Sequence, residues 1–135
     1  VCGRSQSETL AAVRAAVREI DALRDVILPF PAGIVRSGSK VGSKYKPLKA
    51  STNDKWCPTL RGQTDSVLQE GEQAVYEIVI DGLSPRAVAG AMQAAVRAAS
   101  TQDGVLRISA GNYGGKLGPH HFHLHQLDDP NCGVA

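Results

Sequence analysis

The chain has 135 residues, of which 42% are hydrophobic and 21% are charged, and its formal net charge at pH 7 is +2. This length suits one globular domain with a core of its own, and a second domain is not expected. No run approaches the ~18 apolar residues of a membrane span, and three widely spaced cysteines without a signal-peptide pattern predict reduced thiols in a cytoplasm.

The first predicted element is a helix within residues 5–25, because apolar side chains recur there at helical spacing. Ser5 followed by Glu8 matches a capping box at its start, although Ser7 is an equally good cap. Prolines then interrupt the helical pattern. A strand is predicted after them, near residues 34–37.

A long connection at residues 38–73 is rich in glycine, serine, lysine, threonine and asparagine. Loops of this length in a compact domain are often functional. A strand over residues 74–82 follows, indicated by its β-branched and aromatic side chains. A helix over residues 83–100 comes next, with Ser84 as its N-cap and Pro85 at its first position.

The last two predicted strands lie at residues 104–111 and 120–127, the second because its residues alternate cleanly. A split βαβ fold reads β-α-β-β-α-β, so its first strand is missing or cut short here, with residues 1–4 as its tail. We therefore predict an α+β lobe, an α/β sandwich of ferredoxin-like type. Its first strand is truncated, it has an extra C-terminal strand, and it belongs to something larger.

Four histidines in the last predicted strand raise the question of a metal site. His121, His123 and His125 would share one face of that strand, and three imidazoles can bind Zn²⁺ or Cu²⁺. Side chains two residues apart on a strand are about 7 Å apart, however, and no fourth ligand stands nearby in sequence short of Asp128. A strand that faces solvent or another subunit explains the histidines more simply, and no metal site is predicted.

A basic segment separates Asp25 from Asp54, with five lysines and arginines and no acidic residue in between. Such a surplus attracts an anion, either nucleic acid or a small polyanionic substrate. The stretch GSKVGSK lacks the order of the Walker phosphate loop, which argues against nucleotide hydrolysis. Hydroxyl and ammonium groups here could still bind carboxylates or phosphate, and a flexible basic surface loop is the alternative. The residues concerned are Ser37, Ser39, Lys40, Ser43 and Lys44.

Glu77 is a lone carboxylate in the middle of a strongly apolar predicted strand. Alternation along the strand places Glu77 and Val79 on the face opposite Tyr76. If that face is covered, burial favours the neutral acid, which can donate a hydrogen bond to a developing oxyanion or act as a general acid. A glutamate on the wet face of a half-exposed strand is the alternative, and the sequence by itself favours it.

The turn-rich stretch STNDKWCPT carries Asn53, Asp54 and Trp56. It fits a specificity loop around a ring-shaped ligand. It fits equally well an Asx-turn closed by a tryptophan, and the two interpretations stay open.

Four stretches together resemble one known family: PFPAGIVRSGSKVGSKYKPLKASTND, CPT, AVYEIVIDGLS and RISAGNYGGKLG. They closely resemble the C-terminal (distal) lobe of formylmethanofuran–tetrahydromethanopterin formyltransferases, from about residue 4 to residue 127. The stretches YKPLK and HHFHLHQLDD are similar to the versions found in methylotrophic bacteria. The motifs are long and ordered, so the resemblance is specific.

This resemblance implies an acyltransferase that moves a formyl group between the amine of methanofuran, or a bacterial analogue, and N5 of tetrahydromethanopterin. The two carriers are cosubstrates, and no metal or other tightly bound cofactor is implied. Family members are cytoplasmic homo-oligomers, typically tetramers, and the bacterial version is a subunit of a formyltransferase/hydrolase complex. The family subunit is about twice as long, so residues 1–135 would be its C-terminal lobe without the N-terminal one.

The resemblance also implies roles for individual residues. The VYE motif holds the family's catalytic glutamate, which corresponds to Glu77; it is thought to be protonated and to stabilise the tetrahedral intermediate. The basic segment and neighbouring stretches would line a cleft for the anionic tails of the carriers. The substrate-binding candidates are Ser39, Lys40, Ser43, Lys44, Asn53, Asp54 and Asn112.

Two other classes of function compete with this one. The first is a catalytically silent structural lobe within a larger complex. The second is a basic ferredoxin-like RNA-binding module, which usually shows aromatic side chains on its sheet for base stacking. The chain has 4% aromatic residues and carries Glu77 where an aromatic would help, so binding of nucleic acid is not expected.

Overall fold

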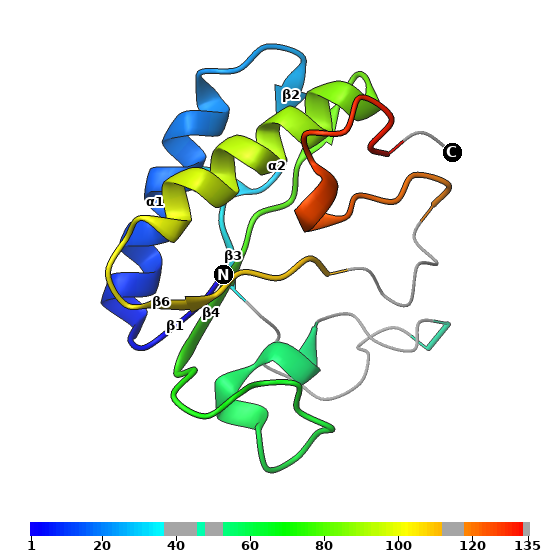
Figure 1. Ribbon diagram of the computed structural model, residues 1–135. Coiled ribbons are helices and arrows are strands. Elements are labelled where there is room, and N and C mark those ends of the chain that lie inside the picture. The colour runs from blue at the N-terminus through cyan, green and yellow to red at the C-terminus, as the bar shows by residue number, and fades with distance from the viewer. Residues whose placement is uncertain (37–45, 48–52, 112–117, 134–135) are drawn as a thin grey trace.

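The computed structural model of the chain describes residues 1–36, 46–47, 53–111 and 118–133 (Figure 1). None of the helices in this part has the length and apolarity that crossing a bilayer requires. The helices are α1 (Gln6–Asp21) and α2 (Pro85–Ser100). The strands are β1 (Cys2–Gly3), β2 (Val26–Ile27), β3 (Val35–Arg36), β4 (Ala74–Glu77), β5 (Asp81–Gly82) and β6 (Val105–Arg107).

The main sheet has four antiparallel strands in the order β3-β4-β1-β6. Helix α1 connects β1 to the far edge strand β3, and α2 connects β4 to β6, so each crossover passes over a strand that lies between its ends. This arrangement is the split βαβ order, and the predicted α+β lobe of ferredoxin-like type is confirmed. The first strand is short, but it occupies the centre of the sheet and pairs on both sides.

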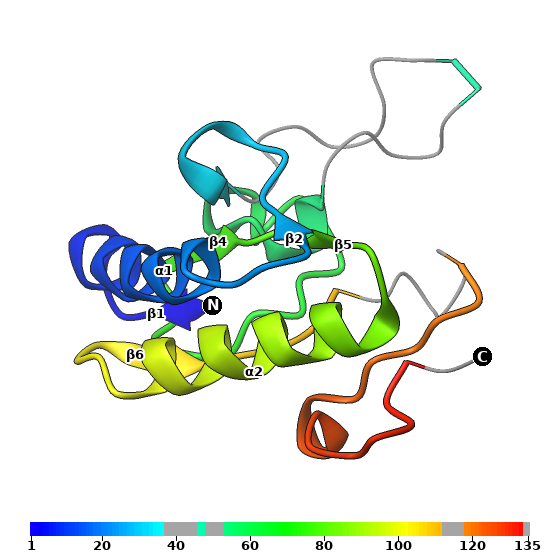
Figure 2. The same cartoon turned by 90° about the horizontal axis from the view of Figure 1, so that it is seen from above.

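The two helices lie side by side against the sheet (Figures 1 and 2). Small side chains make this close approach possible, because Ala12 and Ala16 of α1 and Ala99 of α2 are almost fully buried against one another. Val105 of β6 and Ile108, just after that strand, pack onto this cluster. The core is therefore built from alanines between the helices and β-branched side chains below them.

Side-chain caps fix where both helices begin. At α1, Ser5 Oγ accepts a hydrogen bond from the backbone N–H of Glu8 at 3.3 Å and donates one to Glu8 Oε2 at 2.6 Å. This settles the cap on Ser5 rather than Ser7. At α2, Ser84 Oγ accepts from Ala87 N at 3.2 Å, and Pro85 is the first helical residue, as predicted.

Three predicted strands are divided or shorter than expected, and the small strand β2 has no counterpart among the predicted elements. Residues 74–82 divide into β4 and β5, and β5 leaves the main sheet to pair with β2, whose two residues carry no strand pattern of their own. The strand at residues 104–111 ends at Arg107, and the strand near residues 34–37 is reduced to β3.

The predicted C-terminal strand at residues 120–127 is wrong. In this segment Phe122 and Leu124 are half-buried while the neighbouring His121, His123 and His125 are exposed, so the alternation is present, but none of the described residues pairs with it as a strand. Instead the chain turns through a 3₁₀ helix at Leu124–Gln126. The C-terminal segment then folds back on itself. His120 Nδ1 lies 2.5 Å from Gly133 O, and the ring of Phe122 fills the space that a side chain at Gly133 would need.

Gly3 of β1 marks a place where helix α1 approaches the sheet too closely for a side chain. A Cβ at Gly3 would overlap the hydroxyl of Thr9, which is fully buried, and would lie 2.9 Å from Gly104 O. We therefore expect Gly3→Ala to lower the free energy of unfolding by about 1–3 kcal/mol, the usual cost of overpacking a core. Chemical denaturation of the two proteins measures the difference.

The matched control is Gly90→Ala on the exposed side of α2, where an added Cβ would meet no atom within 4 Å. That substitution should stabilise the protein by up to about 1 kcal/mol, because alanine is the better helix former. Equal effects of the two substitutions would show that β1 is not packed tightly against α1.

Candidate functional site

Glu77, the predicted catalytic residue, is the last residue of β4 and pairs with Val35 of the edge strand β3. Its side chain is half-buried rather than enclosed. One carboxyl oxygen, Oε1, accepts a hydrogen bond from Asn53 Nδ2 at 3.1 Å. The structure thus brings together two of the predicted site residues that are far apart in the sequence.

The segment that carries Asn53 is ordered by its own backbone. Asn53 O accepts from Trp56 N, and Asp54 O accepts from Cys57 N, both at 3.1 Å, which closes the 3₁₀ helix Asp54–Trp56. The turn directs the Asn53 amide toward the end of β4. Asp54 borders a shallow polar hollow together with Lys55 and residues 62–65.

The remaining predicted site residues lie outside the described part of the chain. They are Ser39, Lys40, Ser43, Lys44 and Asn112. Arg36 of β3 is the last described residue before Ser39, Lys40, Ser43 and Lys44. Its neighbour Val35 is the strand partner of Glu77. The basic segment therefore starts from the same sheet edge as the glutamate.

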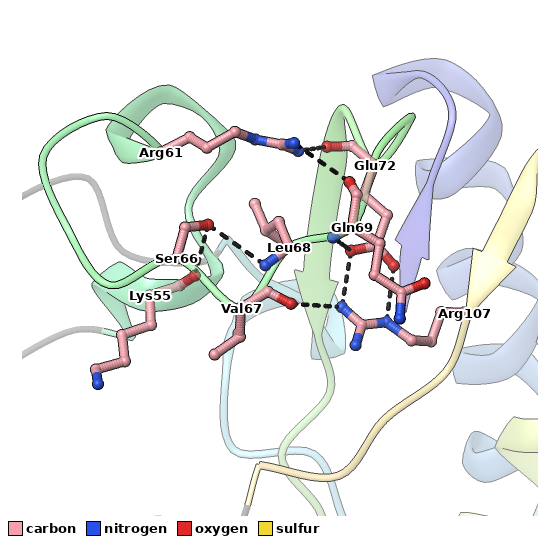
Figure 3. Close-up of polar contacts among 8 residues, drawn as sticks. All are labelled: Lys55, Arg61, Ser66, Val67, Leu68, Gln69, Glu72 and Arg107. Atoms are coloured by element: carbon pink, nitrogen blue, oxygen red, sulfur yellow. Dashed lines mark hydrogen bonds and ion pairs between the residues drawn. The ribbon is translucent and has the colours of Figure 1, made fainter.

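A buried ion pair, which sequence reasoning missed, anchors the loop next to this site (Figure 3). Glu72 is 1% exposed, and its two carboxyl oxygens accept separate hydrogen bonds of 2.7 Å from Nε and Nη2 of Arg107. Glu72 Oε2 also accepts from Gln69 N at 2.8 Å. The hydrogen bond to Glu72 is the main reason that the pKa of Arg107 is raised further above its ordinary value.

Further contacts extend the pair into a clamp on residues 55–72. Arg107 Nη2 also donates to Val67 O at 3.1 Å, and its guanidinium lies 4.9 Å from the ring centroid of Trp56, at cation–π distance. Arg61 donates to Gln69 O at 3.2 Å and to Glu72 O at 2.7 Å (Figure 3). Because Trp56 stands three residues after Asn53, the clamp also fixes the turn that carries the Asn53 amide.

Little in the sequence could have identified this clamp. Glu72 belongs to the polar stretch QEGEQ, where a carboxylate is typical of a solvated loop. Arg107 is the one usable signal, because it is a lone charge inside an apolar strand and such a charge needs a partner when it is covered. The sequence does not say which of the many carboxylates that partner is.

In the described part of the chain, the four C-terminal histidines belong to no cluster of metal-ligating side chains. Within residues 1–36, 46–47, 53–111 and 118–133, no three His, Cys, Asp or Glu side chains gather closely enough to hold an ion. Asp128, the nearest carboxylate considered for this role, instead accepts a hydrogen bond from Gln93 and pairs with Arg97 at 3.7 Å on α2. These contacts attach the C-terminal segment to the helix.

Comparison with known protein families identifies the family to which this site and fold belong. Residues 1–127 match the model of the family described as "FTR, proximal lobe". The chain belongs to this family. The family resemblance read from the motifs is confirmed, while the label "distal" is corrected to "proximal".

Over the aligned region, relatives of this FTR proximal lobe are about half identical to the chain. The formylmethanofuran–tetrahydromethanopterin formyltransferase of Methylococcus capsulatus is 55% identical over 130 residues, which are 94% of this chain and 44% of that protein. The solved formylmethanofuran:tetrahydromethanopterin formyltransferase from Methanosarcina barkeri superposes with a TM-score of 0.84 at 49% identity, over 93% of this chain and 43% of that one.

A second solved neighbour of this FTR lobe comes from a larger assembly. It is a chain of the formyltransferase/hydrolase complex from Methylorubrum extorquens in complex with methylofuran, with a TM-score of 0.81 and 50% identity over 93% of this chain and 42% of that one. The chain thus spans less than half the length of the relatives that it matches.

The clamp can be tested through stability. Replacing Glu72 by glutamine leaves the guanidinium of Arg107 without its buried counter-charge, so we expect the free energy of unfolding to fall by about 3 kcal/mol. Denaturant titration of wild type and variant gives this difference. Glu70→Gln is the control, since Glu70 is exposed in the same stretch, and it should change stability by less than about 0.5 kcal/mol.

Proposed function

We propose that the chain is the lobe of a formyltransferase that carries the catalytic carboxyl for moving a formyl group between a methanofuran-type carrier and N5 of tetrahydromethanopterin. The names of the relatives support the reaction class. The single observation that carries the role of this lobe is Glu77, half-buried at the end of β4 with one carboxyl oxygen held by Asn53.

The proposed formyl transfer requires a hydrogen-bond donor at the position of Glu77. When the accepting nitrogen attacks the formyl carbon, a new C–N bond forms and the carbonyl oxygen becomes an oxyanion. A neutral Glu77 donates a hydrogen bond to that oxyanion. The bond to the departing amine then breaks as the carbonyl reforms, and the proton lost by the attacking N–H ends on the departing amine. A positioned donor of this kind contributes roughly 3 kcal/mol to the barrier reduction.

Substrate contacts are also proposed for the basic segment that follows β3 in the sequence. Ammonium and hydroxyl groups suit the carboxylates and phosphate on the carriers' tails. The residues are Ser39, Lys40, Ser43 and Lys44, together with Asp54 and Asn112. Both carriers act as cosubstrates that leave after each turnover, so no tightly bound cofactor belongs to the proposal.

The proposed setting is a cytoplasmic assembly. The Methylorubrum extorquens neighbour belongs to a formyltransferase/hydrolase complex, and this supports subunits of such a complex as partners. A homo-oligomer, a tetramer as in the family, is the other arrangement that we propose. Mass measurement of the native protein from its own cells distinguishes the two.

The role of Glu77 is tested by Glu77→Gln in the protein's natural, full-length form. The amide fills the same space but has no acidic proton, so we expect a folded protein that loses most of its activity, about 100-fold or more in kcat. The assay follows formyl transfer between formyl-tetrahydromethanopterin and a furan amine. Wild-type rates would remove Glu77 from the mechanism and would favour a silent structural lobe.

The basic segment is tested by Lys40→Ala and Lys44→Ala. If these ammonium groups bind anionic tails, each substitution should raise KM for a carrier several-fold, leave kcat nearly unchanged, and weaken the dependence of KM on salt. Lys46→Ala is the control, because Lys46 is an exposed lysine of the same segment outside the proposed set. Equal effects at all three positions would indicate a diffuse charge effect rather than specific contacts.

A further inference from the structure

The amide of Asn53 has a specific task that goes beyond contact with substrate. Its Nδ2 donates to Glu77 Oε1 at 3.1 Å, across 24 positions of sequence. Both side chains are half-buried, so this hydrogen bond is partly shielded from water. A shielded hydrogen bond between two groups of a proposed site restricts the orientation of both.

The consequence for the carboxyl follows from the chemistry of the two groups. A carboxylic acid carries its proton on one oxygen, and the other oxygen can then only accept hydrogen bonds. An amide NH₂ group donates and cannot accept. The oxygen that faces Asn53 is therefore the accepting oxygen, and the O–H group of the neutral acid is placed on Oε2.

The loop around Asn53 is built to keep the amide in place. In the 3₁₀ helix that follows Asn53, Lys55 O accepts a hydrogen bond from Val67 N at 3.2 Å. It also accepts one from Ser66 Oγ at 3.3 Å (Figure 3). Trp56 lies under the guanidinium of Arg107, which is itself held by Glu72. The amide thus extends from an anchored turn, whereas Glu77 extends from the sheet.

From this geometry we infer that Asn53 is a positioning residue, which orients the Glu77 carboxyl so that its donating oxygen is directed at the reacting formyl group. The inference rests on the proposed function, since it assigns Asn53 a role that acts through Glu77. It differs from the direct substrate contact that the sequence suggested for Asn53. The two roles predict different kinetics.

The experiment is a double-mutant cycle in the natural, full-length protein, with formyl transfer as the readout. Asn53→Ala should lower kcat about tenfold to a hundredfold, because a misoriented catalytic group loses about this much, and KM for both carriers should stay within about twofold. Asn53→Asp keeps the size of the side chain but removes the NH₂ donor, so it should lose at least as much. Gln73→Ala, an exposed amide at the end of the same loop, should have wild-type kinetics.

The decisive step repeats Asn53→Ala in the Glu77→Gln background. If Asn53 acts through the carboxyl, the second substitution should cause little further loss, because coupled residues are not additive. Multiplied losses, or a rise in KM with unchanged kcat, would overturn the inference and restore the role of a substrate contact. Wild-type kinetics for Asn53→Ala would overturn it as well.

The same cycle separates failure of this inference from failure of the proposed function. Glu77→Gln alone reports on the proposed function, and full activity in that variant would overturn both. An inactive Glu77→Gln with an independent effect of Asn53 would overturn only the inference. Circular dichroism of every variant shows that the losses do not come from unfolding.

Discussion

The ion pair between Glu72 and Arg107 is the constraint on which the rest of the lobe depends. It joins Glu72, two residues before β4, to the edge strand β6, across the central strand β1 whose Cys2 lies opposite Arg107. Glu72 is only 1% exposed, and its buried carboxylate is stable because it accepts hydrogen bonds from two N–H groups of Arg107 and from one backbone N–H. If residues 55–72 took another position, the buried charge of Glu72 would lose its partner. The ion pair therefore favours one arrangement of this loop over the others.

This selection reaches the candidate site because Asn53 directly precedes the 3₁₀ helix Asp54–Trp56, where the clamped residues begin. The carboxyl of Glu77 stands on a strand whose position the sheet determines, and its partner amide stands on a turn that the clamp determines. Two independently supported elements therefore meet at one hydrogen bond. Sites held in this way keep their geometry without contributions from the substrate, which is what stabilisation of a short-lived oxyanion requires.

Local chemistry made much of the fold predictable, and long-range pairing did not. Ser5 and Ser84 indicate where the helices start, because an N-cap depends only on residues within one turn. The β-branched residues that follow Ala74 indicate β4 in the same local way. The alternation around Phe122 predicted a strand wrongly, because alternation records one covered face and not whether a strand lies alongside. For the candidate site, family motifs predict a role for Glu77, but neither its hydrogen bond to Asn53 nor the pairing of Glu72 with Arg107 has a signal in sequence spacing.

The central place of β1 has a consequence for how the lobe folds. Cys2 is among the first residues of the chain, yet its partners are Val75 on one side and Arg107 on the other. Helices α1 and α2 can form from neighbouring residues, whereas the middle of the sheet must wait for very distant ones. Contacts of this kind slow folding, since a long loop has to close before any pairing energy is gained. During synthesis α1 would emerge with its apolar face uncovered, and it would be covered only after β4, α2 and β6 had followed.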